Sequence, residues 1–322
     1  GAALARRDLG RRRRRRPPGG VGVGDVLRPV LAAVRARRLV IVPDGPLFLL
    51  PWAAVPDPRG GALIDRHELS LAPSLPWLAV DRGRARPPAP AGAADAIVIA
   101  DPVYAADDPR LTGGAASDLE RPLVASRGGA ELTRLRQTRR EAEAIAALLP
   151  PDQVRVWLDT AAAPAALTGV AAGSARLIHV AAHALIQDGS GETARLALSS
   201  VDTTGAAVDG ELDVAEIRAL RLRAELVVLS ACRTALGTEV RGEGLLGLSH
   251  AFLVAGARRV IATLWPVDDA ATAALMAAFY RALLRDGDAP AAALARAQRT
   301  LAADPRWADP RHWAGFVLVG AP

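Results

Sequence analysis

The 322-residue sequence predicts an α/β protein whose central sheet is mostly parallel and is covered by helices on both faces. Short apolar runs alternate along the chain with segments that have helical hydrophobic spacing. Some of these runs, such as Leu226–Leu229, are apolar throughout, which indicates strands buried on both faces. Apolar residues make up 51% of the chain, enough for a sizeable core. Alternating strands and helices are typical of parallel sheets with helical crossovers.

The N-terminal part divides into a linker and a small structured region. Residues 1–24 are rich in Arg, Pro and Gly, so we expect a linker without fixed structure. The following segment predicts a helix at 25–37, a hairpin of strands 38–42 and 47–50 joined by a turn at 43–46, an extended segment at 68–72 and a helix at 73–80. The Pro-, Ala- and Arg-rich residues 82–94 are the expected boundary. We therefore expect an N-terminal hairpin subregion at 25–94.

Residues 95–322 carry the alternating pattern and form the expected core. The expected strands are 96–100, 154–158, 175–184, 196–199, 226–229, 259–264 and 313–319. The expected helices are 138–149, 163–172, 213–220, 243–255, 270–284 and 289–302, with a turn at 209–212. No internal repeat of solenoid period is evident.

The positive charge is concentrated at the N-terminus. The first 21 residues carry +7, from eight arginines and Asp8, so the other 301 residues carry −1 of the formal net charge of +6. The body of the chain is therefore not basic enough to indicate a nucleic-acid-binding fold. We interpret Arg11–Arg16 as part of the linker, because no aromatic residues interleave the arginines. Contact with nucleic acid or an acidic partner through this tract is the alternative.

The single cysteine, Cys232, excludes an intramolecular disulfide and fits a reducing compartment, so we expect a cytoplasmic protein. No uninterrupted apolar run reaches membrane-spanning length, and no secretory signal follows the N-terminal arginines, so we expect no membrane contact. The chain starts at Gly1 and lacks an initial Met, which leads us to expect a further segment upstream.

A cysteine and a histidine end two of the expected buried strands. Cys232 follows Leu226–Leu229 and two small residues, and His183 ends the strand at 175–184, 49 residues upstream. Open α/β sheets place their chemistry at the carboxyl ends of their strands, so the two side chains are candidates for a thiolate–imidazole pair. The alternatives are a small buried hydrophobe at Cys232 and a hydrogen-bonded core histidine at His183.

Taken together, the motifs resemble a known family. They are VIVPDGPLFLLPWAAV, LAPSL, LIHVAAHA, LSACRTALG and GEGLLGLSHAFLVAGARRVIATLWPVDDAATAALMAAFYRAL, followed by WAGFVLVG. This set, from Leu39 to Gly320, is similar to the CHAT domain, which belongs with caspases, separases and gingipains and often follows tetratricopeptide repeats. The resemblance implies a caspase-like three-layer sandwich and a cysteine endopeptidase. It also implies a protein substrate and activation by an upstream repeat or sensor domain or by a partner protein.

By this resemblance Cys232 is the nucleophile and His183 the base, and the oxyanion is bound by backbone N–H groups of Cys232 and Ala184. The family usually has glycine where this chain has Ala184. A turn with strongly positive φ would not accept alanine. The alternative is therefore a catalytically silent CHAT domain that serves interaction or signalling.

Acidic and aromatic residues at other strand ends are candidates for substrate binding. The WPVDD segment resembles the WDVTD of separases, which places Asp269 at the floor of a pocket for a basic residue before the scissile bond, the P1 residue. The alternative for Asp269 is a helix cap, the role we favour for Asp268. Asp101 is a second pocket candidate and Trp265 a pocket wall. Glu243 is expected in the first turn of its helix.

His179 lies four residues before His183 and is expected to be a buried support. A metal site formed by the two histidines lacks accompanying Cys, Asp or Glu at ligand spacing, so we expect no metal and no cofactor.

Overall fold

The computed structural model describes residues 23–82, 94–111, 132–185, 194–230 and 243–321, and the account below concerns these. The strands are β1 Arg38–Ile41, β2 Glu68–Leu71, β3 Ala96–Pro102, β4 Val154–Asp159, β5 Leu177–Ala181, β6 His183–Leu185, β7 Arg195–Ala197, β8 Glu211–Asp213, β9 Leu226–Leu229, β10 Arg259–Thr263 and β11 Phe316–Gly320. The α-helices are α1 Val23–Ala33, α2 Leu75–Arg82, α3 Arg136–Ala146, α4 Ala165–Thr168, α5 Val170–Ser174, α6 Val214–Ala219, α7 Glu243–Ala255, α8 Asp269–Tyr280 and α9 Pro290–Ala303.

Eight of the described strands form one sheet in the order β1-β2-β11-β10-β9-β5-β3-β4. Neighbouring strands are parallel, except that β10 and β11 are antiparallel. The central strands β5 and β9 are buried along their whole length, as their continuous apolar sequences predicted. The predicted α/β class with a largely parallel sheet is confirmed.

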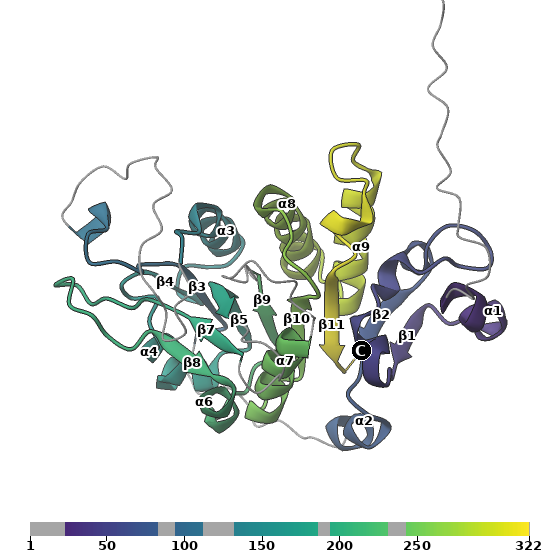
Figure 1. The fold of residues 1–322 in the computed structure, drawn as a ribbon, viewed down its shortest axis with the longest axis horizontal. Helices are drawn as coiled ribbons and strands as arrows, with labels where there is room; N and C mark the ends of the chain where they lie inside the picture. The colour runs from purple at the N-terminus through teal and green to yellow at the C-terminus, as the bar shows by residue number, and fades with distance from the viewer. Residues whose placement is uncertain (1–22, 83–93, 112–131, 186–193, 231–242, 322) are drawn as a thin grey trace, which may run out of the picture.

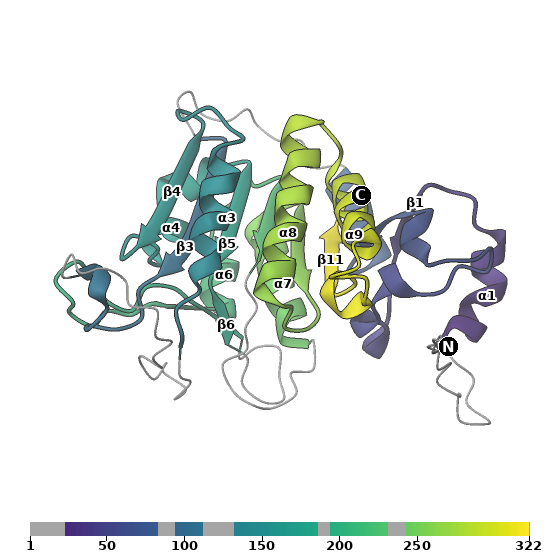
Figure 2. The same ribbon diagram turned by 90° about the horizontal axis from the view of Figure 1, so that it is seen from above.

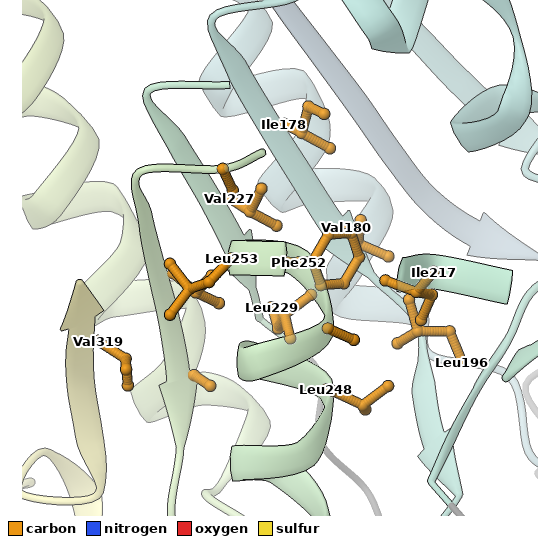
Figure 3. Packing of buried hydrophobic residues seen from close by; sticks show 14 of the residues in the cluster. Ile178, Val180, Leu196, Ile217, Val227, Leu229, Leu248, Phe252, Leu253 and Val319 are labelled. Atoms are coloured by element: carbon orange, nitrogen blue, oxygen red, sulfur yellow. The ribbon is translucent and has the colours of Figure 1, made fainter. Parts of the chain in front are cut away.

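Helices cover both faces of this sheet, which gives three layers (Figure 1). Helices α3, α8 and α9 lie side by side on one face, as the view from above also shows (Figure 2). Helices α4, α6 and α7 lie on the other face. A hydrophobic cluster fills the space on each side of the sheet. Figure 3 shows the cluster under α7, where Leu248 and Phe252 pack against Val227 and Leu229 of β9.

A second, small sheet lies beside the carboxyl end of β5. Its antiparallel strands are β6, β7 and β8 in that order. The sequence predicted one strand through 175–184, but β5 ends at Ala181 and β6 begins at His183. His183 therefore starts a strand of the small sheet and does not end a strand of the large one. The turn expected at 209–212 lies partly in β8.

The predicted N-terminal hairpin is wrong. Residues Gly45–Leu49 form a 3₁₀ helix and no strand, and β1 pairs in parallel with β2. Gly45 has φ +50, and Pro46 stands in the first helical turn, where its missing N–H costs nothing. The indole N–H of Trp52 donates to the carbonyl of Leu47, which holds this short helix. The N-terminal region thus extends the large sheet through β2, next to β11.

The expected helix at 163–172 is two short helices, α4 and α5, because Gly169 between them has an extended backbone conformation. None of the helices in the described ranges is long and apolar enough to cross a membrane. The Arg11–Arg16 tract and nearly all of the boundary expected at 82–94 lie outside the described residues.

Candidate active site

The strands β5 and β9 are neighbours, and their carboxyl ends meet at one edge of the sheet. Val180 pairs with Leu229, and the backbone N–H of Ser230 donates to the carbonyl of Val180 at 3.0 Å. The chain after β5 reaches His183, and Cys232 follows Ser230 by two residues. Cys232 itself lies outside the described residues.

The His183 ring is held by a backbone carbonyl. Its side chain is buried, and Nε2 lies 2.7 Å from the carbonyl oxygen of Thr133. A carbonyl oxygen can only accept a hydrogen bond, so Nε2 carries a proton and Nδ1 is the basic nitrogen of the neutral ring. This is the tautomer that a histidine base acting through Nδ1 requires.

The Tyr104 ring also packs against this histidine. The two ring centroids are 5.3 Å apart, and the Tyr104 hydroxyl donates to the carbonyl of Ala197, which pairs with His183 across β6 and β7. Burial raises the pKa of Tyr104 far above its usual value, although a backbone hydrogen bond with His183 acts in the opposite direction. The phenol therefore remains a neutral donor at all physiological pH values.

Ala184 follows His183 within β6 and pairs with Leu196. Its methyl group is buried in the hydrophobic cluster shared with α6 and α7. Ala184 does not belong to the described residues with positive φ, so alanine costs no backbone strain at this position.

Asp101 lies at the end of β3, and its side chain is fully buried. It binds three arginines. Arg134 makes a bidentate contact, with Nε 2.9 Å from Oδ1 and Nη2 2.7 Å from Oδ2. Arg139 Nε lies 2.9 Å from Oδ2, and Arg110 Nη1 lies 3.1 Å from Oδ1. The carboxylate is thus paired with guanidinium groups of its own chain, and its expected place in a substrate pocket stays a prediction.

Two further aspartates complete this ionic cluster. Asp159, at the end of β4, accepts from Arg110 and Arg139, and Asp108 accepts from Arg110. Burial tends to raise the pKa of Asp159, but hydrogen bonds from Arg139 and Arg110 outweigh it, so the pKa lies below its usual value. The cluster therefore pairs three carboxylates with three guanidinium groups at the edge of the sheet formed by β3 and β4. Removing the only partner of a buried charge would leave that charge uncompensated.

His179 belongs to a buried network beneath this edge. Its Nδ1 lies 2.8 Å from the Tyr280 hydroxyl, and its Nε2 lies 3.3 Å from Oε1 of Glu141. The Ser230 hydroxyl donates to the same Glu141 oxygen. The predicted role of His179 as buried support is confirmed. Among the described residues, no group of three or more His, Cys, Asp or Glu side chains is arranged to hold a metal ion.

Asp268 and Asp269 play different parts at the start of α8. Asp268 is the N-cap, and its carboxylate accepts from the backbone N–H groups of Ala270 and Ala271, which confirms the predicted cap. Asp269 is the first helical residue, and its side chain is exposed. The nearby Trp265 is half-buried, and its indole N–H donates to the carbonyl of Arg311. Glu243 begins α7, but its side chain is outside what the structure describes.

A comparison with protein-family models finds a match to the CHAT domain over residues 24–321. The chain belongs to the CHAT domain family. The match spans nearly all described residues and confirms the resemblance from which the caspase-like architecture was predicted.

Two curated relatives match part of this CHAT domain. Tetratricopeptide repeat protein 28 of Mus musculus is 41% identical over 110 residues, 34% of this chain and 4% of the mouse protein. The protein of the same name from Homo sapiens is 37% identical over 110 residues, again 34% of this chain and 4% of its own length. The matched part of the CHAT domain is therefore a small fraction of the length of either relative.

Two solved structures are among those similar to the CHAT domain. The separase–securin complex of Saccharomyces cerevisiae matches with a TM-score of 0.47 and 14% identity, over 85% of this chain and 15% of the other. The Arg-specific cysteine proteinase gingipain R matches with a TM-score of 0.44 and 10% identity, over 80% of this chain and 55% of the other.

The sequence predicted no role for two residues at the site of this CHAT domain, Thr133 and Glu141. Thr133 contacts His183 through its backbone carbonyl, so the residue type at position 133 could not predict the contact. Glu141 could have been noticed, because it stands four residues before the buried Ile145 on the inward face of α3. An acid on an apolar helix face indicates a buried polar partner, here His179 and Ser230.

Proposed function

We propose that this CHAT domain is a cysteine endopeptidase in which Cys232 is the nucleophile and His183 the base. The hydrogen bond from His183 Nε2 to the Thr133 carbonyl carries the proposal, because it makes Nδ1 the nitrogen that can take a proton from the thiol. The pairing of β5 with β9 supports it as well, since the segments leading to the two residues start from neighbouring strands.

In the proposed reaction the Cys232 sulfur attacks the peptide carbonyl carbon as a thiolate, after its proton has moved to His183 Nδ1. The tetrahedral oxyanion is bound by the backbone N–H groups of Cys232 and Ala184. The C–N bond then breaks, and the His183 imidazolium gives its proton to the leaving amine. Water, deprotonated by the neutral imidazole, hydrolyses the thioester and regenerates the thiol.

We propose that the substrate has a basic P1 residue. Asp269 would bind its side chain, and Trp265 would form one wall of the pocket. Asp268 takes the capping role, which leaves the exposed Asp269 carboxylate available to a substrate cation. A guanidinium group pairs with a carboxylate through two parallel hydrogen bonds, so arginine is the expected preference.

Activation by an upstream repeat domain or a partner protein is also part of the proposal. The mouse and human relatives are named for tetratricopeptide repeats, and their length far exceeds the matched segment. Repeat arrays present extended concave surfaces that bind other proteins, so such an array suits a sensor.

The second candidate is a catalytically silent interaction domain. The argument for it comes from the sequence, where Ala184 replaces the glycine usual in the family after this histidine, although Ala184 does not have a positive φ in the structure. In that case Cys232 would behave as an ordinary thiol, and the wild type and Cys232→Ala would function equally in cells.

An electrophilic probe with arginine at P1 tests the two candidates on the purified chain. We expect covalent labelling at Cys232, located by peptide mass spectrometry, and none in Cys232→Ala. His183→Gln should slow labelling by about a hundredfold, because the thiol loses its base. A labelling rate in the wild type no higher than in His183→Gln would overturn the peptidase.

A further inference from the structure

The ionic cluster at the end of β3 is built on an unusual backbone. Asp101 and Asp159 have φ of 50° and 55°, the described non-glycine residues with positive φ. Such conformations are costly for residues with a Cβ and persist where the surroundings over-determine them. At Asp101 the surroundings are three guanidinium groups and the Thr138 hydroxyl, which accepts from the Asp101 N–H at 3.0 Å.

The cluster is connected to the catalytic histidine through one peptide unit. Arg134, which makes the bidentate contact with Asp101, is the residue directly after Thr133. A bidentate arginine fork fixes both the distance and the plane of its partner. The main chain at 133–134 is thereby tied to β3, and the Thr133 carbonyl faces His183 Nε2.

The same end of β3 also contacts His183 directly. Tyr104 lies three residues after Asp101, and its ring packs against the imidazole. The segment from Asp101 to Tyr104 therefore affects His183 in two ways. Asp101 holds the residue next to Thr133, whose carbonyl lies at Nε2, and the Tyr104 ring packs against the imidazole.

We propose that the Asp101–Arg134 ion pair is a positioning pair for His183. It fixes the Thr133 carbonyl as the acceptor for Nε2–H and so keeps His183 in the tautomer with a basic Nδ1. The inference rests on the proposed function for its catalytic meaning, but the effect on the ring is independent of any activity. Neither Asp101 nor Arg134 touches the substrate in this proposal.

Arg139 supplies a matched control. Like Arg134 it donates to Oδ2 of Asp101, but it stands on α3 and is not next to Thr133. Removing either arginine leaves two guanidinium groups on Asp101, so the buried carboxylate stays paired in both variants. A general loosening of the cluster would affect both variants alike, whereas the positioning role belongs to Arg134.

The test uses the whole chain with ¹⁵N-labelled histidine, whose five imidazoles are resolved by NMR and assigned with His183→Gln. We expect wild type and Arg139→Gln to show His183 as one neutral tautomer protonated at Nε2. Arg134→Gln should lose this preference and show both tautomers. Arg134→Lys, which keeps the charge but not the fork, should retain only part of the preference. Melting curves establish that each variant is folded.

Kinetics provide the second measurement. We expect Arg134→Gln to lower kcat by about ten- to a hundredfold, the usual effect of removing a group that orients a catalytic histidine, with KM nearly unchanged. A His183 tautomer that is the same in Arg134→Gln as in the wild type, or equally altered in Arg139→Gln, would overturn the positioning pair. A tautomer shift in a chain whose Cys232 is inert would keep the positioning pair and overturn the peptidase.

Discussion

The Tyr280 hydroxyl and His179 Nδ1 lie 2.8 Å apart in the core, although 101 residues separate them in the sequence. Burial and the nearby Glu141 carboxylate raise the pKa of Tyr280 well above its usual value, so the phenol stays protonated. The other ring nitrogen faces Glu141, which also accepts from Ser230, two residues before Cys232. Buried polar side chains from α8, β5, α3 and the end of β9 thus form one network, in which His179 Nε2 lies near Glu141 but makes no hydrogen bond with a described residue.

This network predicts a large effect from removing one oxygen atom. Tyr280→Phe leaves the buried Nδ1 of His179 without its hydrogen-bond partner, which costs about 1–3 kcal/mol of unfolding free energy. Urea denaturation measures the loss. In a His179→Leu background the same Tyr280→Phe change should cost much less, because no ring nitrogen is left unsatisfied. Equal costs in the two backgrounds would show that the hydrogen bond contributes nothing.

The sequence predicted the large sheet well because its strands are apolar runs with helical segments between them. The strands β3, β5, β9 and β10 lie where such runs were found. The hairpin was wrong because Leu47–Leu50 is also an apolar run, and periodicity cannot separate so short a strand from a 3₁₀ turn that begins with Gly45 and Pro46. The strands of the small sheet, such as β6, have three residues each and are too short to show alternation.

The sequence predicted parts of the candidate site only where the side chain itself has a recognisable role, such as a base or a helix cap. His183 was found in this way, although it begins β6 and does not end β5, and so was the capping role of Asp268. The partners of Asp101 were not, because Arg134 and Arg139 stand 33 and 38 residues away and no local pattern couples them. The contact with the Thr133 carbonyl could not be predicted either, because every residue has a backbone carbonyl.

Asp268 and Asp269 allow the proposed specificity to be tested by paired variants. Asp269→Asn should reduce kcat/KM for arginine at P1 by about ten- to a hundredfold, the value of a charged hydrogen bond. Asp268→Asn removes the neighbouring charge but keeps a good N-cap, so it should change neither cleavage nor stability much. Asp268→Ala should lose about 1 kcal/mol of unfolding free energy. An unchanged P1 preference in Asp269→Asn would exclude Asp269 from the pocket.

His250 predicts a pH-dependent loss of stability. Burial lowers the pKa of this histidine on α7, with Arg218 adding to the effect, and its buried Nε2 has no hydrogen-bond partner among the described residues. A histidine with a lowered folded-state pKa stabilises the fold fully above its unfolded pKa of about 6.5. The contribution falls as the pH drops from there toward the folded pKa, because the unfolded chain takes up the proton first.

The corresponding experiment compares urea unfolding of the wild type and His250→Gln between about pH 7.5 and 5. The wild type should lose more stability on acidification than the variant, because glutamine does not titrate. Parallel stability curves for the wild type and His250→Gln would contradict the prediction.

Removing the methyl group of Ala184 tests whether this CHAT domain is an active peptidase or a catalytically silent domain. Its backbone has no positive φ and its methyl lies in the core, so we expect Ala184→Gly to bring no gain in cleavage. The variant should instead lose about 0.5–1 kcal/mol of unfolding free energy, the cost of glycine inside a strand. Ala197→Gly, at a buried position of the paired strand β7, should show a similar loss. A rise in cleavage of about a hundredfold in Ala184→Gly alone, the value of a restored oxyanion donor, would instead mean that alanine silences the wild-type domain.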